Sequence, residues 1–323
     1  FYSPTVNTVF ENELELSIPA EREPENTETV LLRLALHRVD ADLPGYGNLL
    51  GMHAFGLEEC GEYARAEAAG RRAAALNPRD GWAVHAVAHT MEMTGRPAGG
   101  IAWLDPATAA WSEDSLFAYH NWWHRALFHM ELGDWAGALA EYDARVRPSP
   151  STAQLQMLDA TALLWRLHLR GIDVGPRWTE LADKWQAVLD DRYYVFNDVH
   201  AMFALVATER FDVAQRLLEN VAASCDGRGT NADMARDVGL PLCTAILAFG
   251  RGQHEAAAEA LIAVRPVAQR FGGSHAQRDI VTMTLLEAAH RGGLRAVEGA
   301  VLAERRDAKP DTPLTRLLLT RLN

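Results

Sequence analysis

The sequence predicts an all-α protein, an α-solenoid of about seven helical hairpins. A short phrase recurs along the chain: a turn residue, a ring two positions later and then alanine, as in Gly133-Asp134-Trp135 with Ala138. Its copies start at positions 61, 95, 133, 171, 209, 252 and 292, which differ by 34, 38, 38, 38, 43 and 40 residues. Helix-favouring apolar stretches flank the copies and strand patterns are nearly absent. Helical hairpins repeated at such a period stack into solenoids.

Each predicted hairpin is justified by what surrounds its turn. Segments rich in Ala, Leu and Glu follow the turns at 64–76, 137–146 and 213–221, and we expect them to form the second helices. Prolines close several of these helices, because a helix interior does not tolerate proline: Pro78, Pro148, Pro266 and Pro310. The polar segments 18–29 and 223–237 are expected to be exposed loops. The final unit, 296–323, is expected to be a cap or a contact surface.

Composition excludes several classes of function. The chain has 323 residues with 31 Lys and Arg against 43 Asp and Glu, a formal charge of −12, and no basic patch, so we expect no nucleic-acid partner. No apolar stretch approaches the roughly 20 residues of a membrane helix, so we expect no membrane association. Three scattered cysteines do not make a disulfide framework, which indicates a reducing compartment, the cytoplasm.

The hairpin resembles the tetratricopeptide repeat, on the evidence of Gly61, Tyr63, Ala66 and Pro78 and of the turn at Gly133 with Pro148. The amino-acid sequence is similar to that of the tetratricopeptide repeat protein 38 family at 50–55, 84–89, 120–124, 196–198 and 273–279. The resemblance implies a right-handed solenoid of about seven hairpins over residues 43–323. It implies that residues 1–42 are an N-terminal segment, the remnant of a longer N-terminal part. The resemblance gives little indication of a biochemical activity.

That resemblance also assigns the faces of the first helices. Core offsets hold mainly apolar residues, as a buried stripe requires. Groove offsets of the second to fifth units hold no lysine or arginine, unlike grooves that clamp peptide carboxylates, and collect histidine and aromatic residues instead. A concave face of this composition is typical of a small-molecule pocket. The residues expected to bind the ligand there are Phe55, Trp82, Trp123, Trp165 and His200.

Two histidine pairs carry the candidate chemistry. His85 and His89 lie one helical turn apart, Glu92 continues their face, and His120 and His124 repeat the spacing in the next unit. One interpretation is a divalent metal held by these four histidines, with Glu92 as base or outer-shell group. The other is a metal-free polar pocket, in which the histidines hydrogen-bond to neighbouring carboxylates. Surface histidines without a common site are a third.

The sequence also allows predictions for the segment 274–279 and for Asp198. Ser274 should cap a helix whose N-terminal N–H groups face an anion, and His275 and Asp279 in that helix could close one end of the groove. The alternative is a plain capping turn. Asp198 falls at a core offset, and a buried carboxylate needs a partner, for which we expect His200 or Arg166.

The sequence therefore favours a small-molecule pocket, with acid–base or metal-assisted catalysis of hydrolase or lyase type as the reaction. The residues assigned catalytic roles are His85, His89, Glu92, His120 and His124. Nucleophile elbows and phosphate-binding glycine motifs are absent. The alternative is a non-catalytic scaffold that binds a protein or peptide in its groove, since fold does not settle function. A homodimer through an exposed terminal unit is compatible with both.

Overall fold

The computed structural model describes residues 43, 45–113, 115, 117–309 and 312–322, so the predicted N-terminal segment 1–42 lies outside the described residues. Over these ranges the chain forms helices and turns without a strand. In chain order the α-helices are α3 (Tyr46–Glu59), α4 (Tyr63–Leu76), α5 (Gly81–Met93), α6 (Pro97–Trp103), α7 (Ala118–Glu131), α8 (Trp135–Glu141), α9 (Gln154–Leu169), α10 (Arg177–Ala187), α11 (Val195–Ala207), α12 (Phe211–Ser224), α13 (Thr230–Met234), α14 (Leu240–Gly250), α15 (His254–Val264), α16 (His275–Arg291), α17 (Arg295–Ala308) and α18 (Pro313–Thr320).

Short 3-10 and π segments connect or extend these helices. The 3-10 segments are η1 (Pro106–Thr108), η2 (Ala110–Ser112) and η5 (Arg265–Phe271), and the π segments are η3 (Tyr142–Val146) and η4 (Ala235–Gly239). Among the described helices, none combines the length and the apolar character that a membrane crossing requires.

The predicted turns join helices in pairs: α3/α4, α5/α6, α7/α8, α9/α10, α11/α12, α14/α15 and α16/α17. Five predicted glycines adopt the left-handed backbone that favours glycine, with φ between 66° and 77°: Gly61, Gly95, Gly133, Gly171 and Gly252. At the fifth turn, between α11 and α12, Glu209 takes the same conformation, with φ 55°. In the last turn the left-handed residue is Gly293 rather than Gly292, one position later than expected. The helical hairpins are confirmed.

The loop predicted at 223–237 is wrong over its second half. Residues Thr230–Met234 form α13 and the chain continues as the π segment η4 into α14. Ala232 and Ala235 are buried there, because these short helices pack beside α12, α14 and η5. Small apolar residues within a polar segment are thus enough to anchor it to the core.

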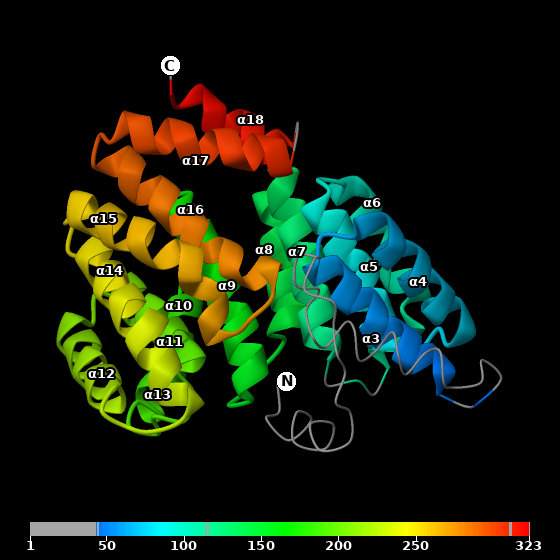
Figure 1. Cartoon of the computed structure of the whole chain (residues 1–323), viewed down its shortest axis with the longest axis horizontal. Helices are drawn as coiled ribbons and strands as arrows, with labels where there is room; N and C mark the ends of the chain where they lie inside the picture. Colours follow the sequence, from blue (N-terminus) through cyan, green and yellow to red (C-terminus); the bar gives the residue numbers. More distant parts are fainter. Residues whose placement is uncertain (1–42, 44, 114, 116, 310–311, 323) are drawn as a thin grey trace, which may run out of the picture.

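The first helices of the pairs lie side by side, and the last ones return to the first. α3 packs on α5, α5 on α7, α7 on α9, α9 on α11 and α11 on α14. In Figure 1, α3–α6 occupy one side and α10–α15 the other, with α7–α9 between them. α16 crosses this row and contacts both α9 and α5, and α18 contacts α7. The C-terminal helices therefore cover the inner face of the row.

Both faces of α5, α7 and α9 are consequently buried over most of their length, with Trp82 near the start of α5 as an exposed exception. The core stripe of α5 is confirmed, because Val84, Val87 and Met91 are at most 4% exposed. The predicted groove face is buried too: His89, Trp123 and Trp165 are each 0% exposed. A helix buried all round needs partners for its polar side chains. Those partners define the candidate site.

The start of α16 is fastened to the end of α3. Ser274 caps α16 with a complete capping box, as predicted. The backbone N–H of His275 donates to Glu59 Oε1 at 2.9 Å, and Arg278 donates to Glu59 Oε2 at 3.2 Å. The anion expected at this helix N-terminus is therefore a carboxylate of the chain itself.

Candidate metal centre

Four histidines from α5 and α7 converge in the interior. One ring nitrogen from each of His85, His89, His120 and His124 can be chosen so that all four lie within 4.8 Å of one another. The ring centroids of His85 and His89 are 4.3 Å apart, and those of His89 and His124 are 4.4 Å apart. The four rings are at most 4% exposed. The two pairs predicted from spacing thus form one buried cluster, which we call the histidine centre.

Local structure fixes how α5 and α7 face each other. Asp80 caps α5 by accepting from the N–H groups of Trp82 and Ala83. The side-chain amide of Asn121 in α7 donates to the carbonyl of Gly81 at 3.0 Å. This bond sets the register between the two helices, because it ties the first turn of one to the first turn of the other. Histidines spaced by four residues then meet across the interface.

Carboxylates from three neighbouring elements face the outer nitrogens of three of these rings. His120 Nδ1 lies 2.9 Å from Asp159 Oδ1, and His124 Nδ1 lies 2.9 Å from Glu92 Oε2, both hydrogen bonds. His89 Nδ1 lies 3.3 Å from Glu58 Oε2 without hydrogen-bond alignment. A carboxylate accepts, so in the two hydrogen-bonded pairs, those of His120 and His124, Nδ1 carries the proton and Nε2 keeps its lone pair. Metal-ligating histidines typically show this arrangement.

Burial keeps three of the imidazoles, those of His85, His89 and His124, neutral. It lowers the pKa of His89 to about 4, and together with the neighbouring histidines it lowers the pKa of His85 and His124 well below the usual range. Burial also raises the pKa of the Glu58 carboxyl to about 7. Neutral imidazole is the form that binds metal ions, so the rings of His85, His89 and His124 are in the ligating state at neutral pH.

The last hairpin supplies cations behind the centre. Lys309 Nζ lies 3.6 Å from Glu92 Oε1 and 4.0 Å from Glu131 Oε1, and Arg305 also pairs with Glu131. Burial opposes ionisation of Glu131, but Arg305 and Lys309 outweigh it and lower the pKa of that carboxyl. Glu92 thus bridges His124 and Lys309, so the outer shell of the histidine centre includes a residue from the far end of the chain.

Aromatic rings enclose the centre on two sides. Trp123 stacks on His120 with ring centroids 5.2 Å apart and is fully buried. On the other side Phe55, Trp82 and Phe117 surround His85, with centroids 5.2, 5.2 and 4.9 Å from its ring. Trp82 is 40% exposed, so this side reaches the surface. We call Phe55, Trp82 and Phe117 the aromatic rim.

Two residues predicted to bind a ligand, Trp165 and His200, make contacts outside the histidine centre. Trp165 Nε1–H donates to Thr284 Oγ1 at 2.9 Å and its ring packs on Phe203, which joins α9 to α16 and α11. His200 Nδ1 bonds to the carbonyl of Phe196 at 2.8 Å, one turn earlier in its own helix. Neither ring belongs to the group of four imidazoles. Packing contacts and these hydrogen bonds account for the positions of both side chains.

The two predicted residues of α16 lie near the centre's periphery. His275 Nε2 is 3.4 Å from Glu59 Oε2, at the contact between α16 and α3. Asp279 lies 3.8 Å from Arg305 and, together with Glu92 and Glu131, lines a recess of about 20 Å³. That volume holds about one water molecule. The recess lies behind the histidine centre.

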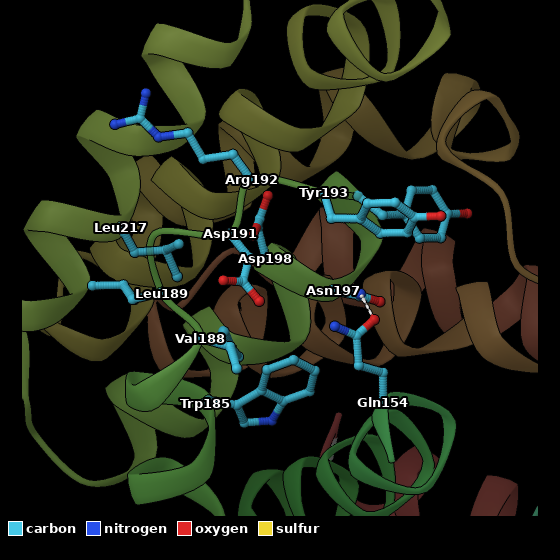
Figure 2. Close-up of a pocket in the computed structure, with 12 residues that line it drawn as sticks. Gln154, Trp185, Val188, Leu189, Asp191, Arg192, Tyr193, Asn197, Asp198 and Leu217 are labelled. Carbon is cyan, nitrogen blue, oxygen red and sulfur yellow. Dashed lines mark hydrogen bonds between the residues drawn. The ribbon is translucent and has the colours of Figure 1, made fainter. Parts of the chain in front are cut away.

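A second recess, of about 10 Å³, surrounds Asp198 in α11 (Figure 2). Asn197 donates to Gln154 beside it at 2.6 Å. The expected partners of Asp198 are wrong, since His200 bonds to a backbone carbonyl and Arg166 donates to the carbonyls of Ala162 and Ala276. Burial raises the pKa of Asp198 to about 7, against the opposing charge of Arg192.

Sequence reasoning missed several residues of the centre. The sequence pattern offers Asp159 as a candidate acid–base carboxylate and places Glu58 at a groove offset of the first unit, but it does not pair either with its histidine. A rule that pairs each histidine with an acidic residue of a neighbouring unit would have found both pairs. Phe117 lies three residues before His120 and was also available. Lys309 gave no local signal, because it lies more than 200 residues from Glu92 in the sequence.

Comparisons with known proteins add no family and no related fold. No protein-family model matches the chain, and no solved structure matches it. The histidine centre is therefore interpreted from its own geometry and chemistry.

Proposed function

We propose that this protein binds a divalent transition metal ion in the histidine centre. The observation that carries the proposal is the set of carboxylates behind His89, His120 and His124. The hydrogen bonds of Asp159 and Glu92 leave Nε2 of His120 and His124 free to bind a metal ion, and Glu58 lies beside the third ring, His89. Imidazole ligands suit zinc, copper, iron and nickel, and zinc is the metal that tetrahedral nitrogen sites bind most commonly.

The dimensions and charge of the centre support this metal. A tetrahedral zinc site with Zn–N bonds of about 2.0–2.1 Å places its nitrogens roughly 3.3 Å apart. The four imidazole nitrogens, within 4.8 Å of one another, need a small contraction to reach that spacing. Asp159, Glu92 and Glu58 bring buried carboxylates, while Lys309 is the cation that faces Glu92. A dication compensates the remaining buried negative charge.

Metal-assisted acid–base chemistry on a small molecule, of hydrolase or lyase type, is the reaction class we propose for the loaded centre. A bound zinc ion acts as a Lewis acid and lowers the pKa of coordinated water. The chain's own residues orient the ligands through Asp159, Glu92 and Glu58. Trp123 and the aromatic rim exclude bulk water, which strengthens electrostatic interactions within the site. The substrate would approach past Trp82, the exposed member of the rim.

For the fold, we propose a right-handed solenoid of the tetratricopeptide type, similar to the tetratricopeptide repeat protein 38 family. Seven helix pairs whose turns carry a left-handed residue support it. The inner face of this arrangement is covered by α16, which contacts α5 and α9. A peptide partner in that face would compete with the protein's own helix, so we favour the metal centre over the scaffold interpretation.

Metal analysis of gently purified protein tests the function. We expect close to one divalent ion per chain by mass spectrometry in the wild type, and near none in His89→Ala. His129→Ala is the matched control, because His129 also lies on α7 and also pairs with a carboxylate, Asp134, but lies outside the group of four. Wild-type protein that stays metal-free after incubation with zinc would overturn the proposal.

A further inference from the structure

His85 differs from the other three histidines of the centre. Its ring is 2% exposed, yet neither Nδ1 nor Nε2 has a hydrogen-bond partner among the described residues. His120 and His124 each bond to a carboxylate. His89 also lacks a hydrogen-bond partner among the described residues, but its Nδ1 lies 3.3 Å from Glu58 Oε2, whereas no described carboxylate lies within ion-pair distance of His85. A buried polar atom without a hydrogen-bond partner destabilises the fold. The ring of His85 is therefore held by packing alone.

His85 also lies on the side of the centre that reaches the surface. Its ring contacts all three members of the aromatic rim, and Trp82 of that rim is 40% exposed. His89 and His124 are fully buried, and their carboxylates Glu58 and Glu92 lie behind them. Phe55 also contacts His89 and Phe117 also contacts His120, but Trp82, the exposed member of the rim, contacts His85. A molecule that enters past Trp82 therefore reaches the ring of His85 first.

We infer that the four histidines are inequivalent ligands: His89, His120 and His124 hold the metal permanently, and His85 occupies an exchangeable fourth position. This inference rests on the proposed function. Catalytic zinc sites keep three protein ligands and an open position, whereas structural sites are closed by four. Ligands fixed by an outer shell hold their geometry, and a ligand without one moves at lower cost.

The rim defines the class of molecule that would take the fourth position. Phe55, Trp82 and Phe117 bring no charge, so the entrance favours a small anionic or neutral donor group carried on an apolar or aromatic body. Water and small inorganic anions such as azide share this donor chemistry and are the simplest probes of the position.

Cobalt(II) substitution tests the inference, because its visible absorption reports coordination directly. Wild type, His85→Phe and His120→Phe are loaded with Co²⁺ and titrated with azide. Phenylalanine keeps a ring among the aromatic neighbours of each histidine, and thermal denaturation checks that each variant folds. We expect His85→Phe to weaken Co²⁺ binding by less than about tenfold and His120→Phe by more than about 100-fold. Azide should half-saturate His85→Phe at about one tenth of the wild-type concentration, because His85 need not be displaced.

Equal loss of Co²⁺ binding in the two variants, or azide that leaves the His85→Phe spectrum unchanged, would show a closed four-histidine site. That result would overturn the inference and leave the proposed metal function standing. Wild-type protein that binds no Co²⁺ would overturn both.

Discussion

Helices α5 and α7 and helices α9 and α11 carry the same pattern of histidine and aromatic residues, yet they use it differently. In the first pair, His120 and His124 bond to carboxylates of other helices. In the second, His200 bonds to a carbonyl of its own helix, and Trp165 bonds to Thr284. Both regions are buried, so burial does not separate them.

The difference lies in what faces the polar edge of each ring. A backbone carbonyl or a hydroxyl satisfies one nitrogen and leaves no excess charge. Asp159 and Glu92 bring carboxylates into a dry interior, where negative charge is costly unless a cation compensates it. Glu58 adds a third carboxyl group, whose pKa burial raises to about 7. The carboxylates, rather than the histidines, distinguish a candidate metal centre from aromatic packing.

The largest expected effect separates the regions by metal content. His124→Ala removes a ring of the centre and should reduce bound divalent metal from about one per chain to near none. His200→Ala removes an equally buried ring of α11 and should leave the metal content unchanged. Mass spectrometry of both purified variants provides the measurement. If His200→Ala also lost its metal, the two regions would form one site.

A second prediction concerns a residue of α9 whose loss should lower stability and leave metal binding unchanged. Trp165 is fully buried between α9, α11 and α16, so Trp165→Ala should lower the free energy of unfolding by about 3–5 kcal/mol. Its metal affinity, measured on the folded variant, should match the wild type. Urea denaturation followed by zinc titration tests both parts. A variant of wild-type stability that binds zinc poorly would place Trp165 in the site after all.

The carboxylates that bond to the histidines allow a test with a smaller expected effect on metal affinity. Asp159→Asn keeps the shape of the side chain but removes the charge behind His120, and should weaken metal binding about 10–100-fold. Asp134→Asn alters the carboxylate of His129, which lies outside the centre, and should leave affinity unchanged. Competition with a chromophoric chelator measures both. Equal affinities would mean that Asp159 is a packing group.

The smallest effect depends on pH and belongs to the second region. Asp198 faces Arg192, Asp191 and Cys243, and burial raises the pKa of its carboxyl to about 7, above the unfolded value. Its contribution to stability is therefore complete at low pH and is lost as the pH rises through 7. Asp198→Asn stays neutral, so its stability advantage over wild type should grow by about 2 kcal/mol between pH 5 and 8.

Urea denaturation of Asp198→Asn and wild type at both pH values measures that growth. Asp191→Asn, on the exposed neighbour, should differ from wild type by less than about 0.5 kcal/mol at either pH. A constant difference between Asp198→Asn and wild type would show that Asp198 is ionised throughout this range.

Local spacing was enough to predict the hairpins, because each turn needs a left-handed residue such as Gly133 and each helix a periodic apolar stripe. It was also enough to place His85, His89, His120 and His124 on facing helices. Spacing did not reveal which carboxylates would face these rings, since Glu58 and Asp159 come from other units. Nor did it separate Trp165 and His200 from the centre, because the position of α16 depends on how the hairpins stack.

The contact between Glu59 and the start of α16 joins residues 216 and 219 positions apart, and α18 lies on α7. Hairpins that touch only their neighbours can unravel from one end while the others persist. Here the last hairpins are fastened to the first, so fraying at either terminus is opposed by contacts with the other. Heat or denaturant should therefore unfold the described helices in one cooperative transition, and Lys309, which faces Glu92, makes the integrity of the final hairpin a condition for an intact histidine centre.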